Sequence, residues 1–189
     1  MIYAIIIAVL VIAAIWFYFT RLVTPTATKF TEPTKKALVL YFSPAGKTKR
    51  LAQKVQAQTN ADIVEIEGTK PYKADPKGRA FVEWVTAATP EVVSKLDDID
   101  DYDTIFLAYP IWYDTAPMIV KQVLKKHNFS NKNIVPVVSF NAVSRGEGRS
   151  IRMIRHHAPR ANVMPRLVLQ DNDQDTQLIK DYLNEVSYK

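Results

Sequence analysis

The residues Ser43 to Thr48 form a short loop with groups that can bind a phosphate. The loop follows an apolar stretch and runs into a helical pattern, so the first N–H groups of that helix lack intrahelical acceptors and lie at the positive end of its dipole. Ser43 and Thr48 add hydroxyl groups, and Gly46 permits a backbone conformation that other residues rarely adopt. The sequence therefore predicts a phosphate site. The alternative is a turn in which Ser43 or Thr48 only caps the helix.

Gly46, Lys47 and Thr48 also match the end of the nucleotide triphosphatase motif G-x-x-x-x-G-K-[ST]. Tyr41 stands where that motif needs its first glycine, and the loop is too short to wrap a triphosphate. We exclude a triphosphatase on this ground.

A second loop, from Tyr109 to Pro117, carries two large aromatic residues, Trp112 and Tyr113. Core aromatics normally lie within a strand or on the apolar face of a helix. We therefore expect both rings to contact a flat ligand and not the core, with Pro110 and Ile111 beside them. Aromatic stacking is worth about 0.5–1.5 kcal/mol beyond area burial. The alternative is a hydrophobic plug that closes the edge of a sheet.

The chain after residue 36 supplies elements that can hold these loops, because it alternates short apolar runs with amphipathic stretches. That alternation predicts parallel strands joined by helices. Strands are expected at 37–42, 61–66, 104–109, 133–140 and 162–169, and helices at 47–58, 80–86, 117–127, 149–157 and 176–186. The predicted fold class is α/β, a doubly wound sheet of five parallel strands. Such sheets bind ligands at the carboxyl ends of their strands.

Together the two loops resemble those of the flavodoxin family, which has a Y-F-S-x-x-G-x-T phosphate loop and a later Y-P-I-W-x-x-x-x-P loop. The resemblance covers roughly residues 36–188. It implies the flavodoxin-like strand order 2-1-3-4-5 and FMN as the cofactor. The FMN phosphate would be bound by Ser43, Ala45, Gly46, Lys47 and Thr48. The isoalloxazine ring would lie by residues 110–114, against a third loop after Phe140 that contains Asn141, Ala142 and Gly146.

Two loops depart from the usual family pattern. Pro44 to Lys47 stands where Arg-Thr-Gly-Asn is more common, so Ala45 offers only its backbone N–H. Lys47 either adds a positive charge beside the phosphate or points to solvent. The third loop is less rich in serine and glycine, so its backbone is less free to approach a ring.

Eighteen apolar residues, Ile2 to Phe19, begin the chain and are soon followed by Arg21. At about 1.5 Å per helical residue they span roughly 27 Å, close to the ~30 Å hydrocarbon thickness of a bilayer. We therefore expect a transmembrane anchor over 1–20, a linker over 21–36 and a flavodoxin-like domain over 37–189. Positive residues beyond the apolar run predict a single-pass protein of the cell membrane whose domain faces the cytoplasm. The alternative is a cleaved signal peptide and export.

The composition narrows the function further. The net charge of +6 suits contact with anionic lipid or phosphorylated ligands, and the lack of cysteine excludes disulfides, thiol catalysis and cysteine metal sites. His156 and His157 are adjacent and point to different sides of a helix, so we expect no metal site. We also expect no nucleic-acid partner, because no basic run is interleaved with aromatics in a known binding pattern.

The expected function is FMN-dependent electron transfer at the membrane, in which the protein fixes the flavin and FMN carries electrons or hydride. No residue of the protein is expected to act as a catalyst. A redox partner protein, quinone and NAD(P)H remain open as partners, because a one-electron carrier and a two-electron NAD(P)H or quinone oxidoreductase use the same loops. The alternative is a cofactor-free module of the same fold that binds a partner at the membrane.

Overall fold

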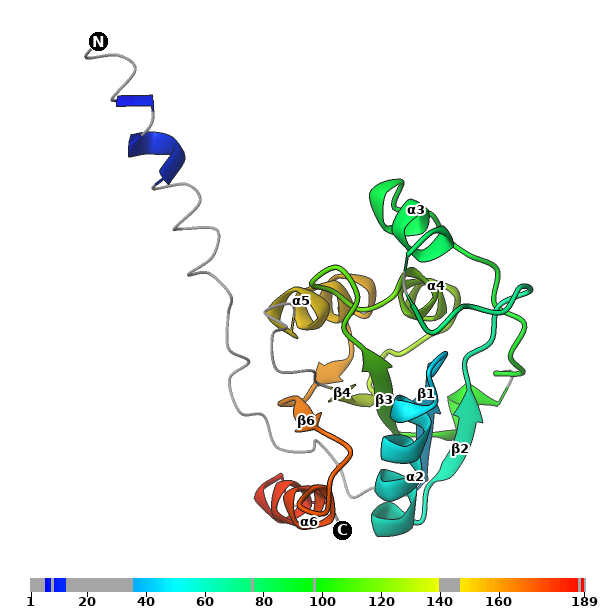
Figure 1. Cartoon of the computed structure of the whole chain (residues 1–189). Helices are drawn as coiled ribbons and strands as arrows, with labels where there is room; N and C mark the ends of the chain where they lie inside the picture. Colours follow the sequence, from blue (N-terminus) through cyan, green and yellow to red (C-terminus); the bar gives the residue numbers. More distant parts are fainter. Residues whose placement is uncertain are drawn as a thin grey trace.

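The protein is described here by a computed structural model that covers residues 6–7, 9–12, 36–75, 77–96, 98–139, 147–186 and 188. Residues 6–7 and 9–12 are helical, and the rest of the predicted anchor and nearly all of the predicted linker lie outside the described residues. Within the described ranges, no helix is both long enough and apolar enough to cross a membrane. The part from residue 36 onward forms a sheet with helices on both faces (Figure 1).

The sheet is parallel throughout its described pairings, and its strand order is β2-β1-β3-β4-β5, as predicted. The strands are β1 (Ala37–Tyr41), β2 (Asp62–Glu65), β3 (Thr104–Pro110), β4 (Asn133–Ser139), β5 (Asn162–Val163) and β6 (Leu167–Leu169). The residues of β1 and β4 are all buried, and only the last residue of β3 is partly exposed. This matches the continuous apolar runs that parallel sheets require, since helices cover both of their faces.

The prediction of one unbroken strand over 162–169 is wrong, because β5 and β6 are separate segments that both pair with β4. Between the pairs Ile134–Val163 and Val137–Leu167, β4 advances by three residues and the β5–β6 segment opposite it advances by four. The extra residue falls beside Pro165, which has no N–H to donate to a ladder. The Pro165 carbonyl instead accepts a 2.6 Å hydrogen bond from the hydroxyl of Tyr182.

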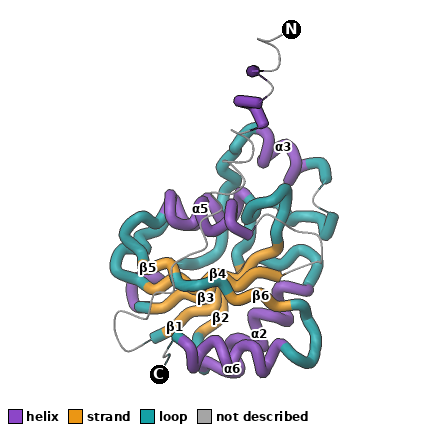
Figure 2. Tube along the Cα trace, turned by 90° about the vertical axis from the view of Figure 1, so that its left-hand side faces the viewer, coloured by secondary structure: helices purple, strands orange, loops and turns teal. Residues whose placement is uncertain are grey.

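The helices lie in two layers on opposite faces of the sheet (Figure 2). They are α2 (Lys47–Thr59), α3 (Arg79–Val85), α4 (Met118–Lys126), α5 (Glu147–His157) and α6 (Asp175–Glu185), with a single 3₁₀ turn, η1 (Ile99–Asp101), before β3. Side chains alternate across each strand, so Val39 and Phe106 join a core with α2 and α6. Leu40 and Leu107 join the other core, with α4 and α5.

An ion pair between a partly exposed lysine and a buried carboxylate links α2 to α6. The Lys54 ammonium lies 2.8 Å from the Asp175 carboxylate, which is fully buried and also accepts hydrogen bonds from the backbone N–H groups of Gln170 and Asn172. Burial works to raise the pKa of the Asp175 carboxyl, but these three hydrogen bonds outweigh burial and hold the pKa below its usual value. The folded protein therefore favours the charged form of this side chain.

Asp175→Asn should lower the free energy of unfolding at pH 7 by about 1–3 kcal/mol, because it removes the negative charge that accepts hydrogen bonds from Lys54 and two backbone N–H groups. The folded pKa is depressed, so the stabilisation by Asp175 is present above the unfolded pKa of about 3.9 and is lost as pH falls through the lower folded value. Urea unfolding of both proteins between pH 7 and pH 3 should therefore show the difference shrinking with acid. The exposed Asp173→Asn is the control, and an equal effect there would contradict the assignment.

Candidate functional site

The loop after β1 folds into a tight turn that opens α2. Gly46 has a φ of 79°, a left-handed conformation that strains any residue with a Cβ. Its N–H donates to the carbonyl of Ser43 at 3.3 Å, and the Ser43 hydroxyl accepts the N–H of Lys49 at 2.9 Å. Glycine is therefore needed here for the turn itself, and the Ser43 hydroxyl is held at the start of the helix.

Thr48 lies in the first turn of α2 and is buried, and its hydroxyl lies 3.1 Å from the hydroxyl of Ser139. Ser139 is the last residue of β4 and pairs in register with Pro110, the last residue of β3. The sequence prediction did not include Ser139, because the strand was expected to continue to Phe140. Its position at the carboxyl end of a strand next to β3 was the signal that could have identified it.

Two of the basic side chains in the first half of α2 form ion pairs with acidic residues outside the cavity. Arg50 donates hydrogen bonds from Nε and Nη2 to Asp171 at 2.8 and 2.5 Å, and the Lys49 ammonium lies 3.8 Å from Glu65. Lys47 differs from these residues because it lines the cavity described below. Lining the cavity does not fix where the Lys47 ammonium group points, so both alternatives for Lys47 stay open.

The loop after β3 makes a turn in which Trp112 and Thr115 exchange backbone hydrogen bonds of 2.9 and 3.0 Å. The two central residues, Tyr113 and Asp114, have positive φ values of 49° and 59°. Such a conformation costs a residue other than glycine on the order of 1–3 kcal/mol and tends to be found at functional sites. The turn fixes the direction of the side chains that precede and follow it.

Trp112 is 9% exposed and belongs to the core on the side of α4 and α5. Its ring meets that of Phe42 edge to face, with centroids 5.3 Å apart, and lies 5.9 Å from that of Tyr72. The expectation that this ring would stay out of the core is therefore wrong. Phe42 precedes the first loop and Trp112 lies within the second, so the aromatic contact joins the two loops.

Tyr113 points elsewhere, because its ring stacks on that of Trp84 in α3, with centroids 5.1 Å apart and an angle of 25° between the planes. It also meets Phe81 at 5.4 Å. Tyr113 therefore does not line the cavity between the loops after β1 and β3 that is described next, whereas Trp112 does.

A cavity of about 240 Å³ lies where the two loops meet, at the carboxyl ends of β1 and β3. Among the described residues its lining combines hydroxyl groups, one lysine and apolar side chains, without a carboxylate: Ser43, Pro44, Ala45, Lys47, Thr48, Ala74, Pro110, Ile111, Trp112 and Ser139. Seven predicted residues are among them, whereas Gly46 shapes the loop without lining the cavity. The predicted Asn141, Ala142 and Gly146 lie outside the described residues.

Two further hollows bear on the assignment. One of about 360 Å³ shares Ser43 and Pro44 with the first cavity and extends along Phe42 and Tyr72. The other, about 860 Å³ and more open, lies at the amino end of the strands, between Lys36, Thr59 and Tyr188. Doubly wound sheets bind ligands at the carboxyl ends of their strands, so the first cavity is the better candidate despite its smaller volume.

A five-position sheet of order 2-1-3-4-5, with a ligand cavity between the loops after β1 and β3, defines the flavodoxin-like class of α/β proteins. The chain belongs to the flavodoxin family, because the family model described as flavodoxin matches residues 36–186. This confirms the family that the loops resemble.

Solved structures agree with this assignment. A candidate flavoprotein from Bacteroides eggerthii is 30% identical over 82% of this chain and 99% of its own, with a TM-score of 0.73. Another from Bacteroides uniformis is 28% identical over 77% of this chain and 97% of its own, with a TM-score of 0.66. A Lactobacillus acidophilus flavoprotein in complex with FMN shares the fold at 19% identity and a TM-score of 0.61, over 78% of this chain and 98% of its own. No curated protein matches the chain significantly.

Replacing Trp112 tests its place in the core. Trp112→Ala should lower the free energy of unfolding of the cofactor-free protein by about 3–5 kcal/mol, the usual cost of removing a buried aromatic. Trp84→Ala is the matched control, because Trp84 is partly exposed and its stacking on Tyr113 is worth about 0.5–1.5 kcal/mol. Urea unfolding measures both. Equal costs for the two variants would show that Trp112 is not a core residue.

Proposed function

We propose that this protein is an FMN-dependent electron-transfer protein, tethered to the cell membrane by its N-terminal segment. The observation that carries the proposal is the cavity between the loops after β1 and β3, where three hydroxyl groups and the start of α2 face apolar residues of the second loop. A phosphate group and a flat apolar ring are the two parts of a ligand that suit such a lining.

The residues present fit the phosphate of FMN. The hydroxyls of Ser43 and Thr48 and the positive end of α2 favour an anion, and Lys47 adds a positive charge. None of the described lining residues is a carboxylate that would repel the anion. Ser139 holds the Thr48 hydroxyl in place from β4. Neither of the other two hollows described above combines hydroxyls, a lysine and a helix start.

The other side of the cavity fits the ring. Pro110, Ile111 and Trp112 offer apolar surface, and the contacts of Trp112 with Phe42 and Tyr72 hold its ring in one orientation. FMN supplies the redox chemistry when it is bound, whereas these side chains orient it and exclude water. Family membership and the FMN complex of the Lactobacillus acidophilus flavoprotein support the same cofactor.

The tether rests on the apolar run from Ile2 to Phe19, whose length suits a bilayer, and on the positive residues that follow it. We place the domain on the cytoplasmic side, where it exchanges electrons with a membrane quinone, NAD(P)H or a redox partner protein. Sequencing the N-terminus of the mature protein separates an intact anchor from a cleaved signal peptide.

Titration of the purified full-length protein with FMN and with FAD tests the cofactor. FMN should bind more tightly, because one short phosphate loop serves one phosphate and the chain has no dinucleotide glycine pattern. Calorimetry and the visible spectrum both report binding. Absence of FMN binding, or tighter FAD binding, would reject the assignment and favour a cofactor-free binding module, for which the core position of Trp112 is the supporting observation.

Thr48→Val should weaken FMN binding by about 1.5–3 kcal/mol, roughly 10–150-fold, because it removes a hydroxyl from the phosphate side of the cavity and keeps the shape of the side chain. Thr59→Val is the control, since Thr59 lies at the far end of α2 and donates to the carbonyl of Val55. Fluorescence titration with FMN measures both variants. Unchanged affinity in a folded Thr48→Val protein would mean that Thr48 serves only the local structure of the helix.

A further inference from the structure

Helix α3 exposes an apolar ridge, defined here as Phe81, Val82, Trp84 and Val85. Phe81 is 47% exposed and Val85 59%, and the other two are also exposed. Only Ala80 and Glu83 of this seven-residue helix are buried. A group of adjoining large apolar side chains on a protein surface marks an interaction site more often than chance exposure.

The orientation of α3 reverses the usual arrangement, in which apolar side chains face the protein. Its one acidic residue, Glu83, points inward and accepts hydrogen bonds from Arg79 at 2.6 Å and from the hydroxyl of Tyr72 at 2.8 Å. Arg79 also lies over the Tyr72 ring, 4.3 Å from its centroid. These polar contacts hold the helix so that Val82 and Val85 face solvent, whereas the partly exposed rings of Phe81 and Trp84 also contact Tyr113.

Basic residues lie on α4 and α5, the two helices on the same face of the sheet as this ridge. Lys121 of α4 donates to the carbonyl of Ala87, two residues beyond the end of α3, at 3.4 Å. Burial and the nearby charges of His156, Lys121 and Lys125 lower the pKa of His157. Together α4 and α5 carry six Lys and Arg residues against one Glu: Lys121, Lys125, Lys126, Arg149, Arg152 and Arg155.

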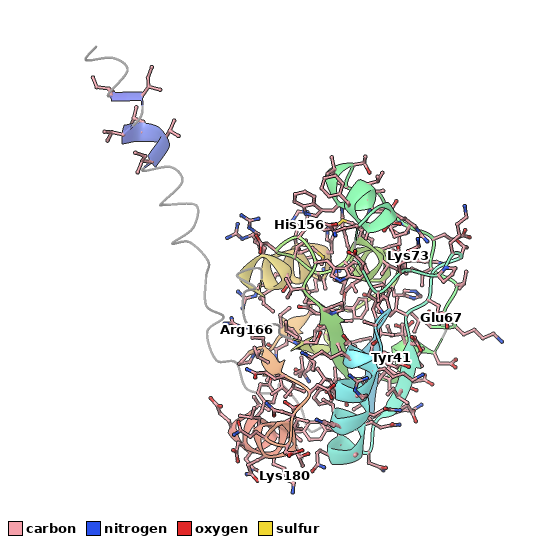
Figure 3. The ribbon with its side chains drawn as sticks, in the orientation of Figure 1. Tyr41, Glu67, Lys73, His156, Arg166 and Lys180 are labelled. Carbon is pink, nitrogen blue, oxygen red and sulfur yellow. The ribbon has the colours of Figure 1, made fainter. Side chains whose placement is uncertain are left out.

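The opposite face of the domain differs. Helix α6 carries three acidic residues, Asp175, Asp181 and Glu185, and one lysine, Lys180. The neighbouring α2 is basic, but three of its four basic side chains lie in ion pairs, with Glu65, Asp171 and Asp175. Figure 3 shows His156 of α5 and Lys180 of α6 on opposite sides of the sheet. Positive charge and exposed apolar surface are therefore combined on the side of α3, α4 and α5.

We propose that this face docks on an anionic lipid bilayer, with the apolar ridge entering the interfacial region and the basic residues of α4 and α5 against the headgroups. Aromatic and aliphatic side chains beside Lys and Arg are what such an interface accepts. The chain also begins with eighteen apolar residues, and the fifteen residues 21–35 can extend over roughly 50 Å, which lets the domain turn this face to the membrane. The inference goes beyond electron transfer and does not depend on FMN binding.

Because the chain has no cysteine, single spin labels can be placed on the full-length protein through Val85→Cys on the ridge and Leu178→Cys on α6, where Leu178 is 45% exposed. Both labelled proteins are reconstituted in vesicles of phosphatidylcholine alone or mixed with phosphatidylglycerol. Collisions with a water-soluble nickel chelate and with membrane-dissolved oxygen report where each label lies. In the mixed vesicles we expect the label at position 85 to lose nickel collisions and gain oxygen collisions, and the label at position 178 to keep both unchanged.

Lys125→Glu with Arg152→Glu should restore nickel access at position 85 without changing visible FMN absorbance, which reports the cofactor site separately. Full nickel access at position 85 in every vesicle would overturn the proposal, and so would equal protection in neutral and anionic vesicles. Protection that disappears on dilution with more lipid of the same composition would show that a second copy of the chain covers the ridge, which also overturns bilayer docking.

Discussion

The parallel pairing of β1 with β3 is the constraint on which the rest of the site depends. Their register runs without interruption from Ala37–Thr104 to Tyr41–Ala108, so the two strands end at the same edge of the sheet. The chain leaves β1 for β2 on one side and continues from β3 to β4 on the other. The loops that follow β1 and β3 therefore meet at the point where winding reverses, and their residues form a cavity between them.

This pairing also divides the interior into two cores. Alternate residues of the central strands face α2 and α6 or face α4 and α5, so each strand contributes to both. The site lies where the layers meet: Thr48 comes from α2 on one side, and Trp112 belongs to the core on the other. Ser139 and Pro110, paired in the sheet, lie between them. A ligand in the cavity would thus contact both layers and the sheet edge.

Much of this arrangement could be predicted from the sequence, because buried parallel strands and amphipathic helices have strong periods. These periods predicted the alternating strands and helices, whereas the resemblance to the flavodoxin family implied the strand order, and the structure confirms that order. The break at Pro165 was not predicted, because Met164 before the proline and Leu167 to Leu169 after Arg166 continue the apolar pattern and hide the extra residue. The direction of Trp112 and Tyr113 could not be predicted either, because it depends on positive φ angles at Tyr113 and Asp114, residues that rarely adopt them.

The inward position of Glu83 has a consequence for motion. Helix α3 buries little apolar surface, which places it at the low-stability end of the fold, where segments open locally without global unfolding. Tyr113 stacks on Trp84, so an opening of α3 removes the support of the strained turn that follows Trp112. Fluctuation of a surface helix is thereby transmitted to a wall of the cavity. A partner bound to α3 would restrain Trp84, and with it the Tyr113 ring that stacks on it beside the cavity wall.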